Sequence, residues 1–98
     1  MALAVEIGKL IDRDSGISGG RPKIAGTGLT VRRVVGWYKM GMTPEDIALQ
    51  YPHLTLAQVH AALAYYHANR EEIEADIAQE EQAAEHWERQ LANGPDRG

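Results

Sequence analysis

Two helix starts, twelve residues apart, constrain this fold more than any other feature of the sequence. The stretch "TPEDIALQYP" opens with the N-cap Thr43, a proline at the first helical position and two acids, and its final proline is expected to end the helix. The next helix starts with Thr55 and Gln58, which have the spacing of a capping box. Only "PHL" is left between them, so the sequence predicts the two helices and short turn of a helix-turn-helix.

Further helices are expected on both sides of this pair. "TVRRVVGWYKMG" is predicted to form a helix capped by Thr30 and stopped by Gly41. Beyond residue 70 the chain is rich in helix formers up to the Gly-Pro pair at 94–95. Asn69 could cap a separate fourth helix, or the third helix could continue through it; the sequence leaves both arrangements open.

The N-terminal region carries weaker signals, and these favour β structure. "VEIGKLI" alternates apolar and polar residues as a strand does, and "PKIAG" could add a second short strand, which Pro22 would confine to an edge. Two such strands are not stable alone in water, so they need a helix or another chain beneath them. The predicted fold class is mainly α, with short N-terminal strands, a three-helix core and a long acidic C-terminal helix.

Composition narrows the class of protein. The chain has 98 residues, enough for one small domain with an appendage, and no cysteine, which excludes disulfides and thiolate metal sites. No apolar run approaches the roughly 18 residues of a membrane span, and the N-terminus lacks the pattern of a signal peptide. These features favour a cytoplasmic protein.

Charge is unevenly distributed along the chain. Residues 1–60 hold seven Lys or Arg and five Asp or Glu, whereas residues 61–98 hold three and nine. The interval 15–44, called the basic segment below, contains no acid. A basic front and an acidic tail suggest two surfaces with different partners, although ordinary surface charge with a lopsided distribution would give the same count.

The glycine-rich stretch "GGRPKIAGTGLTV" does not match a nucleotide-binding loop, since it lacks the Gly-Lys-Ser/Thr of a Walker loop and the last glycine of a dinucleotide fingerprint. Its basic residues suit DNA phosphates better, and the first turn of the helix from Thr55 would face base edges. However, residues 42–68 contain no Lys or Arg, so a helical hairpin that packs its own core is the alternative. The candidate DNA-binding residues are Arg21, Lys23, Arg32, Arg33, Lys39, Thr55 and Gln58.

No arrangement typical of an enzyme, a metal site or a cofactor site stands out. His53, His60 and His67 recur every seven residues, and neighbours on one helix would be roughly 10 Å apart, too far to share one metal ion. No nucleophile lies at a recognisable spacing from a base. We therefore expect surface or half-buried histidines and no catalytic activity.

The acidic helix from Arg70 has a narrow apolar stripe, too thin to pack as core, and is expected to project and to dock on a second protein. The expected anchors are Ile73, Ile77, Trp87 and Leu91, with Glu72, Asp76, Glu80 and Glu88 steering toward a basic groove. A homodimer is expected as well, because short edge strands and this stripe are poorly buried in a lone chain. Use of the stripe for the homodimer alone is the alternative.

Residues 5–70 as a whole resemble the domain of unknown function 433 family. The resemblance rests on a Gly-x-Pro-x-Ile-x-Gly-Thr pattern, a Gly-Met-x-x-Glu-x-Ile pattern, "YP-x-L" and "V-x-A-A-L-x-Y". The matching residues are Gly20, Pro22, Ile24, Gly26, Thr27, Val31, Gly41, Met42, Glu45, Ile47, Tyr51, Pro52, Leu54, Val59, Ala62, Leu63 and Tyr65. One departure is Gly28, where the family usually has arginine, so any contact made by that arginine is missing here.

The resemblance implies a homeodomain-like helix-turn-helix and an antitoxin role beside a PIN-like ribonuclease toxin. The expected protein is then an antitoxin-type regulator that binds operator DNA as a dimer through residues 1–69 and holds the toxin through residues 70–98. The alternative is a protein-interaction or scaffold module without DNA binding.

Overall fold

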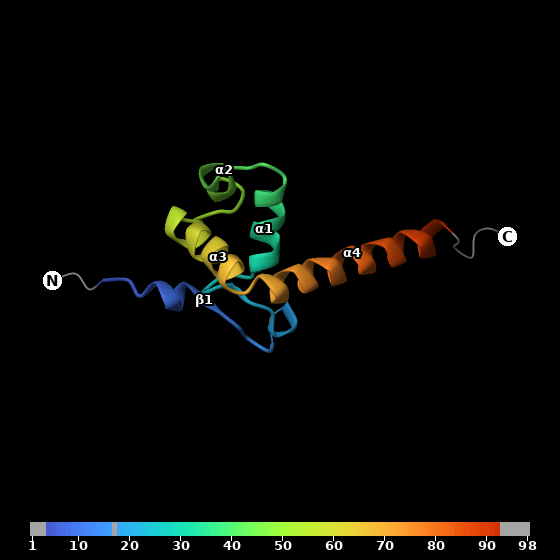
Figure 1. Cartoon of the computed structure of the whole chain (residues 1–98), viewed down its shortest axis with the longest axis horizontal. Helices are drawn as coiled ribbons and strands as arrows, with labels where there is room; N and C mark the ends of the chain where they lie inside the picture. The colour runs from blue at the N-terminus through green and yellow to red at the C-terminus, as the bar shows by residue number, and fades with distance from the viewer. Residues whose placement is uncertain (1–3, 17, 93–98) are drawn as a thin grey trace.

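The computed structural model describes residues 4–16 and 18–92 and is mainly helical, with one short antiparallel sheet near the N-terminus (Figure 1). This confirms the predicted fold class. In chain order the elements are the 3₁₀ helix η1 (Ile7–Leu10), β1 (Ile11–Asp12), the 3₁₀ helix η2 (Ser18–Gly20), β2 (Lys23–Ile24), α1 (Val31–Lys39), α2 (Pro44–Ala48), α3 (Leu56–Ala68) and α4 (Arg70–Ala92).

The strand expected over "VEIGKLI" is mostly absent, and this prediction was wrong. The backbone N–H of Lys9 donates to the carbonyl of Glu6 at 3.0 Å, and the two side chains form an ion pair at 2.8 Å, so the segment turns locally into η1. Only two residues remain as β1, and they pair antiparallel with β2, Ile11 opposite Ile24. The second strand, expected in "PKIAG", is present as β2.

The three predicted N-caps are confirmed. The side chain of Thr30 accepts the backbone N–H of Arg33, and Thr43 and Thr55 each begin a complete capping box at the start of α2 and α3. After α1 the chain turns at Gly41 with a φ of 95°, a left-handed conformation that glycine adopts without strain. Short local signals therefore fix where these helices begin and where α1 ends.

Helix α2 is shorter than expected, and the connection to α3 is correspondingly longer than "PHL". It ends at Ala48 because the N–H groups of Leu49 and Gln50 bond to carbonyls only three residues back, which tightens the chain out of the α-helix. The connection then passes through His53 with a φ of 63°. Tyr51 lies in this connection and is 37% exposed.

The core lies where α1, α2, α3 and the start of α4 meet over β2. Its fully buried side chains come from every one of these elements: Ile24, Val31, Val34, Val35, Ile47, Val59, Tyr66 and Ile73. Leu56, the first residue of α3, lies outside this core and is 42% exposed. The core therefore includes the first turn of the acidic helix.

Helices α3 and α4 are separate. Asn69 leaves the helical conformation (φ −131°, ψ 47°), and its side-chain amide donates back to the carbonyl of Tyr65 at 3.1 Å. Helix α4 begins at the next residue, packs its first turns against α1 and then extends away from the domain (Figure 1). The expected stop at 94–95 lies outside the described residues.

Several large apolar side chains are left at the surface. Val5 and Ile7 near the N-terminus are 71% and 70% exposed, and Trp87 and Leu91 on α4 are 66% and 73% exposed. These side chains mark two surfaces at the ends of the described chain.

Within residues 4–16 and 18–92, no helix has both the length and the apolar character needed to cross a bilayer.

Candidate interaction site

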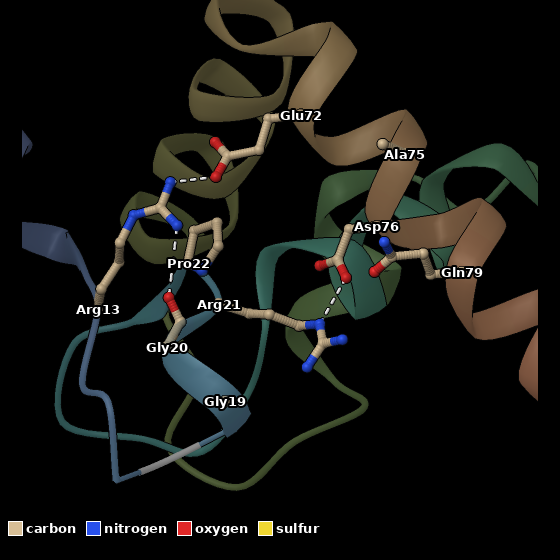
Figure 2. Close-up of a pocket in the computed structure, with 9 residues that line it drawn as sticks. All are labelled: Arg13, Gly19, Gly20, Arg21, Pro22, Glu72, Ala75, Asp76 and Gln79. Atoms are coloured by element: carbon tan, nitrogen blue, oxygen red, sulfur yellow. Dashed lines mark hydrogen bonds and ion pairs between the residues drawn. The ribbon is translucent and has the colours of Figure 1, made fainter.

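The basic segment and the first half of α4 form one ion-paired layer. We call residues 70–80 the inner half of α4 and residues 81–92 its outer half. Arg21 donates from Nε to Oδ1 of Asp76 at 2.6 Å (Figure 2), and Arg32 donates from Nη1 to the same oxygen at 3.0 Å. Nε of Arg32 also lies 3.2 Å from a carboxylate oxygen of Glu80. The inner half therefore neutralises Arg21 and Arg32, two cations of the basic segment.

A second contact in this layer joins three helices at Glu74. Nζ of Lys39 lies 2.6 Å from Oε1 of Glu74, and the hydroxyl of the buried Tyr66 donates to Oε2. The hydrogen bond from Lys39 and then that from Tyr66 lower the pKa of Glu74, and the same carboxylate raises the pKa of Lys39 and of Tyr66. Glu74 thus ties α4 to α1 and α3.

A third contact ties the N-terminal region to α4. Arg13 donates to the hydroxyl of Tyr65 at 2.7 Å and to the carboxylate of Glu72, and the Tyr65 hydroxyl donates to that carboxylate at 2.8 Å. Burial and then the bond to Glu72 raise the pKa of Tyr65, while Glu72 raises that of Arg13. Together these groups hold the chain before η2 against the inner half.

The placement of the five candidate DNA-binding cations corrects the expectation of a free basic front. Lys23 is 4% exposed and pairs with Asp12 at 2.8 Å, and Arg21, Arg32 and Lys39 pair with the inner half. Arg33 is exposed and has no carboxylate partner in the described part of the chain. The distribution of charge along the sequence did not predict this pairing, because the acids of α4 that neutralise Arg21, Arg32 and Lys39 lie between 35 and 55 residues away in the chain.

Figure 2 shows the pocket of about 360 Å³ beneath this layer, lined by Arg13, Gly19, Gly20, Arg21, Pro22, Glu72, Ala75, Asp76 and Gln79. Its acids and bases are already joined to one another across the pocket. One oxygen, Oδ2 of Asp76, is buried and accepts no hydrogen bond from the described residues, which costs stability because a buried carboxylate oxygen loses its water. The ion pairs around this pocket therefore join the N-terminal region to α4, which is a structural role.

A groove of about 430 Å³ opens where α4 leaves the domain, lined among others by Gly28, Arg33, Trp37, Tyr51 and Glu80. A Cβ built at Gly28 would meet nothing within 4 Å, and its φ is not in the left-handed region. The arginine expected here from the resemblance would therefore begin in open space at the groove. Its absence here leaves Arg33 as the exposed guanidinium of the groove.

The first turn of α3, expected to read base edges, uses its polar groups for its own cap. Oε1 of Gln58 accepts the backbone N–H of Thr55 at 2.8 Å, and the Thr55 hydroxyl accepts the N–H of Gln58 at 3.1 Å. Bidentate recognition of adenine needs both the oxygen and the nitrogen of the Gln58 amide. Such recognition would require opening the capping box.

The histidines do not converge. His67 packs its ring against Tyr38 and Tyr66, with centroids 6.2 and 5.2 Å apart, while His53 and His60 are exposed. Among the residues that the structure describes, no three His, Cys, Asp or Glu side chains are grouped to hold a metal ion.

The four expected partner anchors separate into two pairs. Ile73 is fully buried in the core of the chain itself, so the expectation that it faces a partner was wrong, and Ile77 is half-buried against that core. The reason is that the ion pairs of residues 72–80 hold this part of the stripe on α1. Trp87 and Leu91 lie on the outer half and are mostly exposed.

Comparison with known proteins identifies the family to which the globular part of the chain is similar. The family described as protein of unknown function (DUF433) matches residues 11–66. The crystal structure of a DUF433 member protein from Anabaena variabilis is similar, with a TM-score of 0.67 and 31% sequence identity over 71% of this chain and 69% of that chain. No curated protein matches. The family match covers more than half of the sequence and ends before α4, and the chain belongs to the DUF433 family.

Proposed function

We propose that this protein is a partner-binding module of the antitoxin type, whose outer half of α4 docks on a second protein. One observation carries the proposal. The apolar positions 73, 77, 84, 87 and 91 lie on one side of α4, in an alternating spacing of four and three whose remaining position is the charged Glu80. The beginning of this stripe is buried in the core, and its continuation exposes Trp87 and Leu91 with no described residue packed over them.

The charge around the exposed stripe defines the chemistry of the partner. Glu81, Glu85 and Glu88 lie on the outer half, beyond Glu80, the last carboxylate of α4 that pairs with a described cation of α1 or the N-terminal region. An apolar groove bordered by Lys or Arg would therefore complement this helix. A ribonuclease, the partner implied by the family resemblance, must have a basic cleft because it binds RNA.

The test is a direct titration of the purified chain with the purified product of the adjacent gene, by calorimetry. The double variant Trp87→Ala/Leu91→Ala should bind at least roughly 100-fold more weakly, since truncation of two apolar anchors removes on the order of 3 kcal/mol. Met40→Ala/Leu49→Ala is the matched control, because these side chains are 76% and 83% exposed on a different surface. Equal affinity of both double variants would refute the proposal.

Binding of operator DNA is the second candidate function, and the observation that favours it is the position of Arg33. Its guanidinium is exposed at the start of α1 and has no described carboxylate to release before meeting a phosphate. Arg33→Ala should then weaken binding to all sequences and reduce the salt slope by about one unit. A gel shift with the upstream DNA at low salt measures this, and no shift with or without the partner would exclude the function.

A further inference from the structure

A second exposed apolar surface lies on the opposite side of the domain from the outer half of α4. It consists of two shallow grooves, of about 270 and 250 Å³, between η1 and α3. Both grooves are lined by Ile7, Ala61 and Ala64; Ile11, Tyr65 and Ala68 extend one, and Leu10, Ala57 and His60 extend the other. Ile7 is 70% exposed and stands as a ridge between them.

This surface, the η1–α3 face, differs from the rest of the molecule in its charge. Residues 56–68 of α3 contain no Asp, Glu, Lys or Arg. The nearest charges on η1 are Lys9 and Glu6, which pair with each other. A surface without net charge does not repel an identical copy of itself, whereas the acidic outer half of α4 does.

We propose that the η1–α3 face binds a second copy of this chain in a two-fold symmetric dimer. In such a dimer each face must complement itself, which requires a ridge and a groove on the same surface. The η1–α3 face provides both, because the Ile7 ridge of each copy can enter a groove of the other. The alanines at 57, 64 and 68 are exposed along α3 beside η1, and their small side chains leave room for the Ile7 side chain of the other copy.

The outer half of α4 is a poorer site for self-association. In an antiparallel pair of these helices centred on Ala84, Glu81 of one copy would lie beside Glu88 of the other, twice by symmetry. Such like-charge neighbours are destabilising. The charges therefore direct the outer half toward a basic partner and leave self-association to the η1–α3 face.

The dimer has a consequence that rests on the proposed function. In Figure 1, η1 lies near one end of the molecule and the outer half of α4 extends toward the other. A dimer through the η1–α3 face therefore keeps both outer halves accessible. Two docking helices on one particle would bind a dimeric partner with an avidity that one helix lacks.

Sedimentation velocity of the full chain, from low to high micromolar concentration, tests the dimer. Ala64→Glu places a charge in both grooves at an exposed helical position and should weaken dimerisation roughly 100-fold or more, because the charge would be desolvated without a partner. Ala78→Glu, on the exposed side of α4, is the matched control and should dimerise like the unmodified chain. Circular dichroism checks that both variants are folded.

A mixture of Ala64→Glu and Ala64→Lys should recover the dimer, because the two-fold arrangement brings these positions near one another. An unmodified chain that stays monomeric, an Ala64→Glu variant that still dimerises or a mixture that stays monomeric would each overturn the proposal. So would a dimer lost in Trp87→Ala/Leu91→Ala. Partner binding by a monomeric Ala64→Glu variant would leave the proposed function intact, whereas a dimer without partner binding would refute that function alone.

Discussion

The inner and outer halves of α4 are similar in sequence and differ in what they contact. Both carry acids and both continue the same apolar stripe. In the inner half, each of the carboxylates Glu72, Glu74, Asp76 and Glu80 pairs with a cation from the N-terminal region or α1. In the outer half, no described cation of the domain pairs with a carboxylate. The role of a residue on this helix therefore depends on its distance from α1 more than on its type.

The lengths of the two helices explain where the division falls. Helix α1 has nine residues and spans about 14 Å, whereas α4 has 23 residues and spans about 35 Å. The contacts run antiparallel, with Lys39 at the end of α1 beside Glu74 and Arg32 at its start beside Glu80. Once α4 passes the first turn of α1, the domain offers nothing further to cover the stripe.

The largest expected effect separates the two halves by stability. Ile73→Ala should lower the free energy of unfolding by about 2–4 kcal/mol, since it leaves a cavity at a fully buried position. Leu91→Ala removes a similar side chain that is 73% exposed and should change the free energy of unfolding by less than about 0.5 kcal/mol. Urea unfolding followed by circular dichroism measures both.

The variants should be compared at low protein concentration, where a dimer does not add to the apparent stability. Equal losses for Ile73→Ala and Leu91→Ala would mean that the outer half is also covered within the folded chain. Such a result would contradict the division of α4 and remove the basis for partner docking.

The contrast also shows which features could be predicted from the sequence. The caps at Thr30, Thr43 and Thr55 depend on groups within three residues, so their signals lie in short stretches of sequence. The first strand could be predicted only in part, because most of the alternating segment forms the 3₁₀ helix η1 instead. An alternating pattern does not distinguish such a local turn from a strand. The mainly helical character of the fold followed from the helix signals, and the presence of short N-terminal strands from the weaker strand pattern.

The candidate site was harder to predict because its contacts are distant in sequence. The pairing of Arg21 and Arg32 with Asp76 spans 55 and 44 residues, and it depends on the direction that α4 takes after Asn69. The apolar stripe shows which side of α4 is apolar. It does not show at which residue the rest of the domain stops packing against that side. Of the expected anchors, Trp87 and Leu91 are exposed and stay candidates for partner binding, whereas Ile73 is buried within the chain itself.

A smaller effect should distinguish the two halves by pH. The lowered pKa of Glu74 means that its carboxylate is favoured in the folded state, so its contribution to stability is present above the usual glutamate pKa of about 4.3 and is lost as the pH falls through the lowered value. The raised pKa values of Lys39 and Tyr66 affect stability only at alkaline pH. These two groups therefore do not contribute to the pH dependence in the acidic range where Glu74 titrates.

Glu74→Gln should therefore destabilise the chain at pH 7, and the difference from the unmodified chain should shrink as the pH is lowered toward about 3. The effect is modest because Lys39 and Glu74 are 43% and 40% exposed, and salt should reduce it further. Glu81→Gln is the control, since this exposed carboxylate of the outer half has no Lys or Arg three or four residues away on α4, so its loss should matter less at pH 7. Urea unfolding of the three proteins at both pH values gives the comparison. A difference for Glu74→Gln that stays constant down to pH 3, or an equal loss for Glu81→Gln at pH 7, would show that the ion pair with Lys39 does not hold the inner half on α1.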